Sequence, residues 1–170
     1  VKEFTDLNTG HLYQRFDCQM SWEEAKAFCE ARGGHLVTIT SSAENQLVIE
    51  LITSSENADK ALESNYYIGA TDAKVDGKWD WVTGEPFNYE NWDKNLPEPN
   101  GGTAENYSMI MAVDNPPNKS VGEWLDCPNT HFGDVYATIN SGFVCEYDSV
   151  TTTYTITYNA NGGTGAPAAQ

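Results

Sequence analysis

The chain has 170 residues, of which 39% are hydrophobic, and it carries five Trp, nine Tyr and six Phe, enough apolar material for one folded domain and a tail. Lys and Arg total 9 against 25 Asp and Glu, which gives a formal net charge of -16. This charge repels phosphate backbones and anionic membranes and argues against nucleic-acid binding, whereas carboxylates supply the hard oxygen ligands that calcium prefers.

Two further features concern the compartment. No apolar run approaches the ~18–20 residues that cross a bilayer, and the polar opening Val1–Glu3 is no signal peptide, so we expect a piece of a longer precursor. The cysteines lack the CxxC spacing of zinc ribbons and redox sites. They favour two disulfides in an exported protein, with four buried thiols in a cytosolic protein as the alternative. These cysteines are Cys18, Cys29, Cys127 and Cys145.

The first half of the chain alternates strands and helices. Residues 11–16 alternate in polarity and predict a strand. A capping box at residues 21–24 starts a helix that ends at Gly33–Gly34. Residues 36–39 predict a short strand, and a second capping box at residues 41–44 starts the next helix.

After about residue 65 the pattern becomes rich in strands and loops. Residues 83–105 contain several Pro, Gly and Asn and predict a long irregular loop, a feature that is usually functional or disordered. The pattern predicts an α+β domain over residues 1–149. Its later strands are expected at Tyr66–Ala70, Trp79–Val82, Ser108–Ala112, Val121–Trp124 and Gly142–Tyr147.

The last segment, residues 150–170, has a different residue pattern from the rest of the chain. Residues 151–158 alternate as in a strand, and residues 159–167 are rich in turn formers. Because one strand cannot bury a face alone, we expect the truncated start of a further module, with a flexible linker as the alternative.

One group of oxygen-bearing side chains points to metal chemistry. Glu98–Asn100, Glu105–Asn106 and Asp126 offer carboxylate and amide oxygens from loops or strand ends. Calcium takes six to eight such oxygens. Pro99 restricts the turn, and a cis bond before it would let Glu98 and Asn100 point to one side. A solvated acidic loop is the alternative interpretation.

An ordered set of short motifs gives the chain a resemblance to the C-type lectin-like domain over residues 8–148. The resemblance implies a double-loop α+β fold with two helices, small antiparallel sheets, a long calcium-binding loop and a disulfide that joins Cys29 to Cys145. The motifs are Trp22–Ala25 with Cys29, Gly33–Leu36, Tyr67–Gly69, Trp79–Trp81, Asn91–Trp92, Glu98–Asn100, Trp124–Asp126 and Phe143–Glu146.

The resemblance also implies the residues of a primary calcium site. Its ligands, which would also hold a sugar, are Glu98, Asn100, Glu105 and Asp126. The family usually has Asn where this chain has Leu125, so one ligand is lost and weaker calcium binding is expected, unless water or a neighbour such as Asn129 substitutes. The Glu-Pro-Asn order resembles the mannose-type motif, which favours the equatorial hydroxyls of mannose, glucose, N-acetylglucosamine or the similar pair of fucose.

Further sites follow from the same resemblance. A second calcium site would use Asp72, Asp76, Glu105 and Asn106. A third, structural site is suggested by Ser42, Glu44 and Glu146. Where some members carry a cysteine of a second bridge this chain has Tyr107, and we expect Cys18 to pair with Cys127 instead.

The tail resembles the opening of a bacterial surface repeat of the internalin B-repeat type, carried by residues 154–163. This resemblance implies a bacterial protein at the cell surface or secreted. The C-type lectin-like motifs imply a glycan ligand, for which a host glycoprotein is a candidate source, and no membrane insertion is expected because the apolar runs are too short. The prediction is therefore a calcium-dependent carbohydrate-binding module of an adhesin. The alternative is a protein-binding or structural module of the same fold.

Several other interpretations are set aside. The five tryptophans, at positions 22, 79, 81, 92 and 124, are expected in the core and not in a sugar-stacking platform. The three histidines, His11, His35 and His131, are scattered along the sequence, so a shared zinc site is not expected. The clustered carboxylates fit calcium better than a glycosidase pair, and the chain is not expected to be an enzyme.

Overall fold

A computed structural model of the protein describes residues 2–54, 65–112, 120–130 and 141–148. The expected tail at residues 150–170 and His131 lie outside these ranges. The elements are β1 (Lys2–Thr5), β2 (Leu12–Phe16), α1 (Trp22–Glu30), β3 (His35–Leu36), α2 (Ser42–Thr53), β4 (Asn65–Thr71), β5 (Asp80–Trp81), the short 3₁₀ helix η2 (Gly102–Ala104), β6 (Tyr107–Met111), β7 (Trp124–Cys127) and β8 (Ser141–Tyr147).

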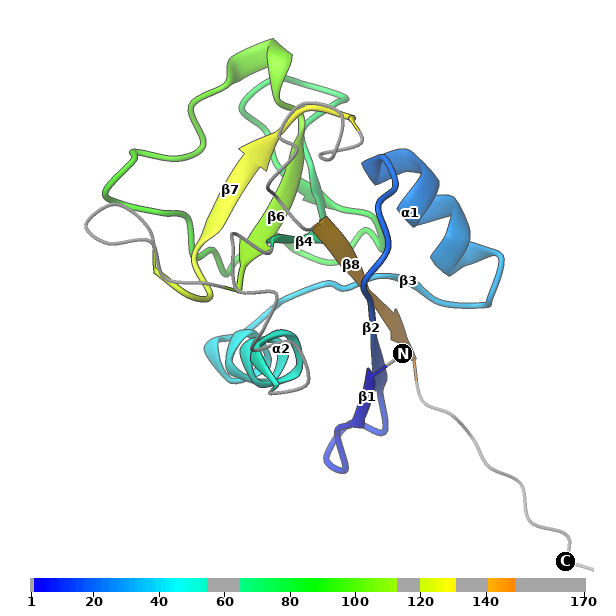
Figure 1. Ribbon diagram of the computed structural model, residues 1–170. Coiled ribbons are helices and arrows are strands. Elements are labelled where there is room, and N and C mark those ends of the chain that lie inside the picture. Colours follow the sequence, from blue (N-terminus) through cyan, green and yellow to red (C-terminus); the bar gives the residue numbers. More distant parts are fainter. Residues whose placement is uncertain (1, 55–64, 113–119, 131–140, 149–170) are drawn as a thin grey trace, which may run out of the picture.

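The described strands form one mixed sheet in the order β1-β2-β8-β4-β6-β7, with β3 on β8 and β5 on β4. The pairs are antiparallel except β4 with β8, which is parallel, so the small antiparallel sheets of the prediction are joined into one. Figure 1 shows the irregular segment between β5 and β6 at the opposite end of the molecule from the β1–β2 hairpin. The α+β fold with two helices is as predicted.

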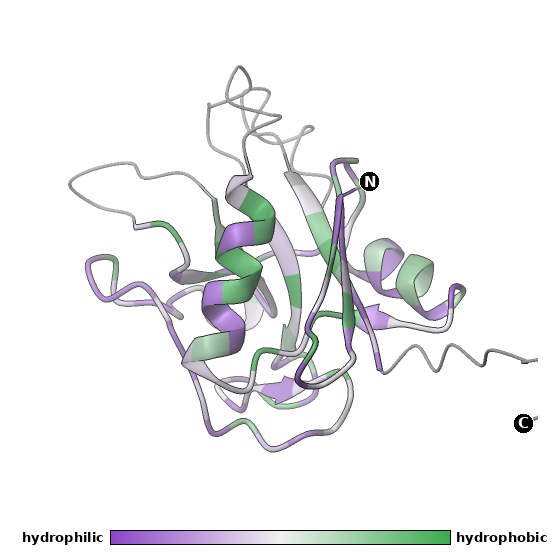
Figure 2. Cartoon of the chain, turned by 90° about the horizontal axis from the view of Figure 1, so that it is seen from below, coloured by the Kyte–Doolittle hydropathy of each residue, from purple (hydrophilic) through white to green (hydrophobic). Residues whose placement is uncertain are grey.

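The two helices begin where the sequence indicates. Ser21 and Glu24 form the complete capping box of α1. At α2 only half of the expected box is present: the Ser41 hydroxyl accepts from the Glu44 N–H, but the Glu44 carboxylate accepts from the Thr40 N–H at 2.7 Å. The view in Figure 2 shows α2 with hydrophobic and hydrophilic bands against the sheet.

Apolar side chains fill two clusters, one on each side of the central strands. The first includes Trp79, Trp81, Trp92 and Trp124 with Val48 and Ile68, and the second includes Trp22, Leu36, Met109, Leu125 and Cys145. All five tryptophans are buried, which confirms the core-packing prediction and excludes a surface platform made of them. Among the described residues, no helix is long and apolar enough to span a bilayer.

Strand β7 is displaced from its prediction. It covers Trp124–Cys127, whereas residues 121–124 were expected. Gly122 has a φ of 85°, and the Glu123 N–H donates to the Ser120 carbonyl at 3.2 Å, so a turn occupies the expected start. The shift places Asp126 within the strand and next to the long loop.

A buried arginine joins β2 to α2. Arg15 is 1% exposed, and its Nη1 donates to the carbonyls of Leu51 at 3.2 Å and Ile52 at 3.0 Å in the last turn of α2. Its Nη2 donates to Asp17 at 2.9 Å. The guanidinium therefore satisfies carbonyls that a helix end leaves without partners.

Candidate functional site

The long loop between β5 and β6 is anchored on Trp124 of β7. Trp124 is fully buried, and its indole N–H donates to Asn45 Oδ1 at 2.8 Å. The Trp124 N–H donates to the Asn91 carbonyl at 2.8 Å, and the Asp93 N–H donates to the Trp124 carbonyl at 2.9 Å. The loop therefore runs along β7 and is brought beside Asp126 of the same strand.

Asp93 is a site residue that the sequence did not single out. Its side chain is 0% exposed, and Oδ1 accepts from the N–H groups of Asn95 at 2.7 Å and Leu96 at 3.3 Å. Its carbonyl accepts from the Glu98 N–H at 3.0 Å. Oδ2 is buried without a hydrogen-bond partner among the described residues. The one available signal was its place directly after the Asn91–Trp92 motif.

Glu98 and Asp126 form the centre of an acidic cluster beside Asp93. The Glu98–Pro99 bond is cis. Asp126 Oδ2 accepts from the Gly101 N–H at 2.8 Å, whereas Asp126 Oδ1 and Glu98 Oε2 are buried and have no hydrogen-bond partner among the described residues. Two buried acceptors without donors, on carboxyl groups that contact each other, are an arrangement that needs a proton or a cation.

The pKa values of the cluster reflect this crowding. Burial raises the pKa of Glu98 to about 8, together with its contact with the Asp126 carboxyl and the negative charges of Asp126, Glu105 and Asp93. Burial and the charge of Asp126 also raise the pKa of Glu105. The cluster therefore disfavours full ionisation without a compensating positive charge.

The other predicted ligands of the primary calcium site are less closely grouped. Asn100 is exposed, and its Nδ2 donates to the Leu96 carbonyl at 3.4 Å. Glu98, Glu105 and Asp126 do not offer three oxygens all within 4.8 Å of one another; among the described residues, such a group of three is formed elsewhere. Leu125 packs in the second core cluster and takes no part in the site. The predicted ligands thus share one loop–strand junction without forming a closed shell.

The predicted second site lies next to this cluster. Asp72 is 4% exposed; Oδ2 accepts from the Gly77 N–H at 2.8 Å, and Oδ1 is buried without a partner in the described part of the chain. Burial raises the pKa of Asp72, with further contributions from the charges of Asp76 and Asp126. The Asn106 carbonyl accepts from the Asp72 N–H at 3.2 Å. The structure therefore brings Asp72 near Asp76 and near the backbone of Asn106. The Asn106 side-chain amide instead donates to the Thr103 carbonyl at 3.2 Å.

Comparison with known proteins decides the family. The family model for the lectin C-type domain matches residues 18–147. The chain belongs to the C-type lectin domain family. A perlucin-like protein of Mytilus galloprovincialis is 28% identical over 127 residues, 74% of this chain and 69% of the relative. Human C-type lectin domain family 4 member F is 35% identical over 82 residues, 48% of this chain but 12% of that protein, so the chain spans a small part of this relative.

Solved structures agree on the fold. The mouse scavenger receptor C-type lectin carbohydrate-recognition domain superposes with a TM-score of 0.64 at 24% identity and covers 89% of this chain and 97% of that chain. The cow CD23 carbohydrate-recognition domain was solved in the presence of a GlcNAc2Man3 oligosaccharide. Its TM-score is 0.61 at 24% identity, and the match covers 83% of this chain and 90% of that chain. Herring type II antifreeze protein has a TM-score of 0.59 at 23% identity, and the match covers 82% of this chain and 91% of that chain.

The cysteines of this C-type lectin domain are four free thiols in the structure. Cys29 on α1 and Cys145 on β8 are both buried and within hydrogen-bonding contact of each other, the arrangement that the predicted bridge requires. Cys18 is exposed, whereas Cys127 is buried. Both pairings stay predictions.

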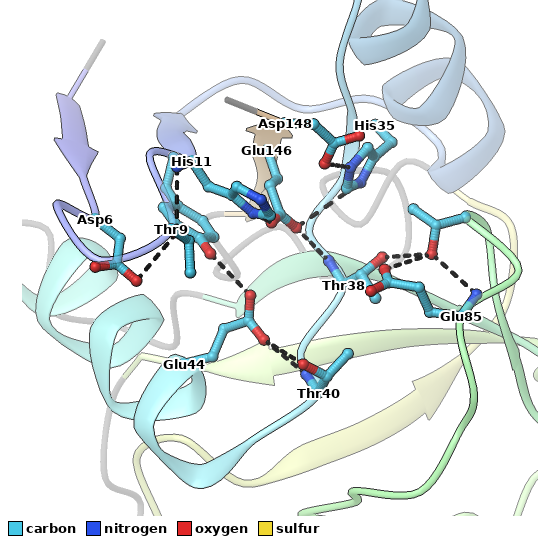
Figure 3. Close-up of polar contacts among 12 residues, drawn as sticks. Asp6, Thr9, His11, His35, Thr38, Thr40, Glu44, Glu85, Glu146 and Asp148 are labelled. Atoms are coloured by element: carbon cyan, nitrogen blue, oxygen red, sulfur yellow. Dashed lines mark hydrogen bonds and ion pairs between the residues drawn. The ribbon is translucent and has the colours of Figure 1, made fainter. Parts of the chain in front are cut away.

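At the third metal site suggested for this C-type lectin domain, the partners of Glu44 and Glu146 differ from those expected. The Glu44 carboxylate is already satisfied by the Tyr13 hydroxyl at 2.8 Å and by the Thr40 N–H and hydroxyl. Glu146 is instead flanked by two histidines: His11 Nδ1 lies 2.7 Å from Oε1, and His35 Nδ1 lies 3.9 Å from Oε2 (Figure 3). His11 and His35 are far apart in the sequence, but strand pairing brings both of them to Glu146.

Proposed function

We propose that this C-type lectin domain is a calcium-dependent carbohydrate-binding module. The observation that carries the proposal is the pair of buried oxygens, Glu98 Oε2 and Asp126 Oδ1, at the junction of the long loop and β7, for which the described part of the chain offers no donor. C-type lectin domains commonly use calcium, and the members of the family are generally not enzymes.

The residues at this junction fit a hard divalent cation. They supply carboxylate and amide oxygens, the donor set that calcium takes. Burial raises the pKa values of Glu98 and Glu105, and the neighbouring negative charges raise them further. Calcium, when bound, would supply a compensating positive charge and a centre that accepts sugar hydroxyl oxygens. Asp93 and Asp72 add negative charge nearby, which partly offsets the ligand that Leu125 does not provide.

The selectivity would come from Glu98, Asn100 and Asp126. A carboxylate accepts a hydrogen bond from a sugar hydroxyl, whereas the Asn100 amide donates one, so a hydroxyl pair must match this fixed order. Glu98 before Asn100 supports the mannose-type preference for equatorial vicinal hydroxyls. A site with few buried atoms binds weakly, on the order of millimolar, and useful adhesion requires several copies.

The biological setting is part of the proposal. An exported, cell-surface or secreted bacterial adhesin accounts for the glycan site, for the two predicted disulfides and for the repeat-like residues 154–163. A glycan on a host glycoprotein is the partner that this setting implies.

A second function, a protein-binding or structural module with weak sugar binding, has its own support. Leu125 points into the core, and the three carboxylates do not close within 4.8 Å. The similarity to an antifreeze protein supports non-sugar ligands for this fold.

A glycan array distinguishes the two functions. Binding of mannose-type glycans in calcium, lost with a chelator and lost in Glu98→Gln, supports the lectin. Glu90→Gln is the matched control, because Glu90 is an exposed acid of the same loop and should keep every signal. Glycan binding that persists after chelation rejects the calcium mechanism, and no binding in calcium, with a folded protein, favours the second function.

A further inference from the structure

A second cluster of metal-ligating side chains lies away from the long loop. His11, Glu146 and Asp148 each offer one ligand atom, and these atoms all lie within 4.8 Å of one another. Figure 3 shows them converging beside His35, and Figure 1 places β1, β2 and the end of β8 at the opposite end of the molecule from the loop. The proposed sugar site uses none of them.

Strand register explains why these residues meet. Strand β2 pairs antiparallel with β8, with Leu12 opposite Tyr147, so His11 lies at the next position opposite Asp148. On the other side of β8, His35 of β3 is opposite Glu146. Three adjacent strands therefore place two imidazoles and two carboxylates at one edge, which no sequence spacing reveals.

Two of the three ligands, Glu146 and Asp148, are held by a second partner. Glu146 is 3% exposed, and Oε2 accepts from the Thr38 N–H at 3.0 Å, which directs Oε1 to His11 at 2.7 Å. His35 Nδ1 donates to the Leu36 carbonyl at 2.9 Å, and Nε2 lies 3.3 Å from Asp148 Oδ1. Metal sites use outer partners of this kind to fix ring orientation and to position carboxylates.

The surroundings of this cluster favour a bound cation that keeps one coordination position open. His11 and Glu146 line an open pocket of about 540 Å³. Its lining includes further acids, among them Asp6, Glu44 and Glu85, and none of the described residues that line it is Lys or Arg. Such a pocket attracts cations and leaves room for a water or a small ligand.

We propose that His11 Nδ1, Glu146 Oε1 and an Asp148 oxygen bind a divalent transition-metal ion of the Zn²⁺ class, with His35 as the positioning residue of Asp148. The imidazole ligand selects this class over calcium, which prefers oxygen alone. Three protein ligands with a fourth open position are typical of accessible zinc sites. The ion would join the β1–β2 hairpin to the end of β8.

Isothermal titration with ZnCl₂ tests the proposal on the whole 170-residue chain. Saturating calcium fills the loop site first, and an alkylating agent blocks any Cys18 thiol that the predicted bridge to Cys127 leaves free, which removes a competing ligand. We expect one zinc ion per chain that calcium does not displace. His11→Ala should weaken zinc binding at least tenfold, because loss of even an outer partner of a metal ligand typically costs about that factor. Glu90→Gln, which changes an exposed acid of the long loop, should bind zinc as the wild type does.

Cobalt(II) gives an independent readout, because its visible absorption reports nitrogen and oxygen coordination. The band should be present in the wild type and lost in His11→Ala. If His11→Ala does not fold, Asp148→Asn replaces it, since Asp148 is exposed at the end of β8 and its loss should weaken zinc equally. Equal zinc affinity in wild type and variants, displacement of zinc by calcium, or no binding at ~100 μM zinc overturns the proposal and leaves the sugar site unaffected.

Discussion

Replacing Glu98 by Gln should have opposite effects on stability and on calcium binding. Glu98 Oε2 and Asp126 Oδ1 are buried in a cluster of four carboxylates, and the pKa of Glu98 rises from 4.5 to about 8. A neutral amide of the same shape removes one negative charge and offers an N–H to Asp126. The calcium-free protein should therefore gain stability, while the site loses a charged ligand.

The size of the gain follows from the electrostatics. Two carboxylates ~4 Å apart repel by about 4 kcal/mol at an effective dielectric constant of 20. Because Glu98 is partly open to water, solvent screening reduces this to roughly 1–2 kcal/mol of unfolding free energy. For a domain of this size the gain corresponds to about 2–8 °C in melting temperature. Calcium affinity should fall at least tenfold, since a charged ligand is lost.

The pH dependence has a definite sign. The folded-state pKa of Glu98 exceeds the unfolded value, so the folded protein holds this proton more tightly. The charge penalty is negligible below about pH 4.5 and grows toward pH 8. The stabilisation by Glu98→Gln should thus be largest near pH 8 and vanish as the pH falls to 4.5.

Thermal melts in chelator at several pH values, with calcium titrations at pH 8, measure both effects. Glu90→Gln is the control, because an exposed acid of the same loop should change neither quantity. A lower melting temperature for Glu98→Gln in chelator at pH 8, or an unchanged calcium affinity, would refute the reasoning.

Three further predictions concern the scaffold. Trp124→Phe removes the indole donor to Asn45 and should lower the free energy of unfolding, measured with denaturant, by about 2–3 kcal/mol. The destabilised loop should also lose calcium binding. An unchanged unfolding midpoint would show that this hydrogen bond does not support the site. Arg15→Met leaves the last carbonyls of α2 without donors and should cost about 2–4 kcal/mol, whereas the exposed Arg32→Met should stay within ~0.5 kcal/mol. Oxidised protein should contain a Cys29–Cys145 bridge in peptide mass mapping, and its reduction should cost about 4–5 kcal/mol; peptides with both residues as free thiols would contradict the pairing.

Local sequence signals predicted the elements well. Ser21 with Glu24 located the start of α1, and Ser41 located the start of α2, because capping depends on residues three apart. The motif at Glu98–Asn100 located the acidic cluster, since its residues lie on one loop. Local signals failed at β7, where the turn at Gly122 displaced the strand.

Contacts between distant segments could not be predicted in this way. The role of Asp93 depends on Trp92 pairing with Trp124, a bridge between the loop and β7. His11 and His35 meet at Glu146 only because β2 and β3 both pair with β8. Glu44 matched a capping and metal-site pattern, yet one of its oxygens is taken by Tyr13 of β2 and the other by Thr40, which directly precedes the Ser41 N-cap.

The most direct test of the calcium claim is an anomalous difference map from crystals grown with abundant calcium chloride. The account predicts a peak between Asn100 and Asp126, with oxygens of Glu98 and Asp126 at ~2.3–2.6 Å from it. Ordered side chains of Glu98 and Asp126 with no peak between them, at saturating calcium, would contradict it.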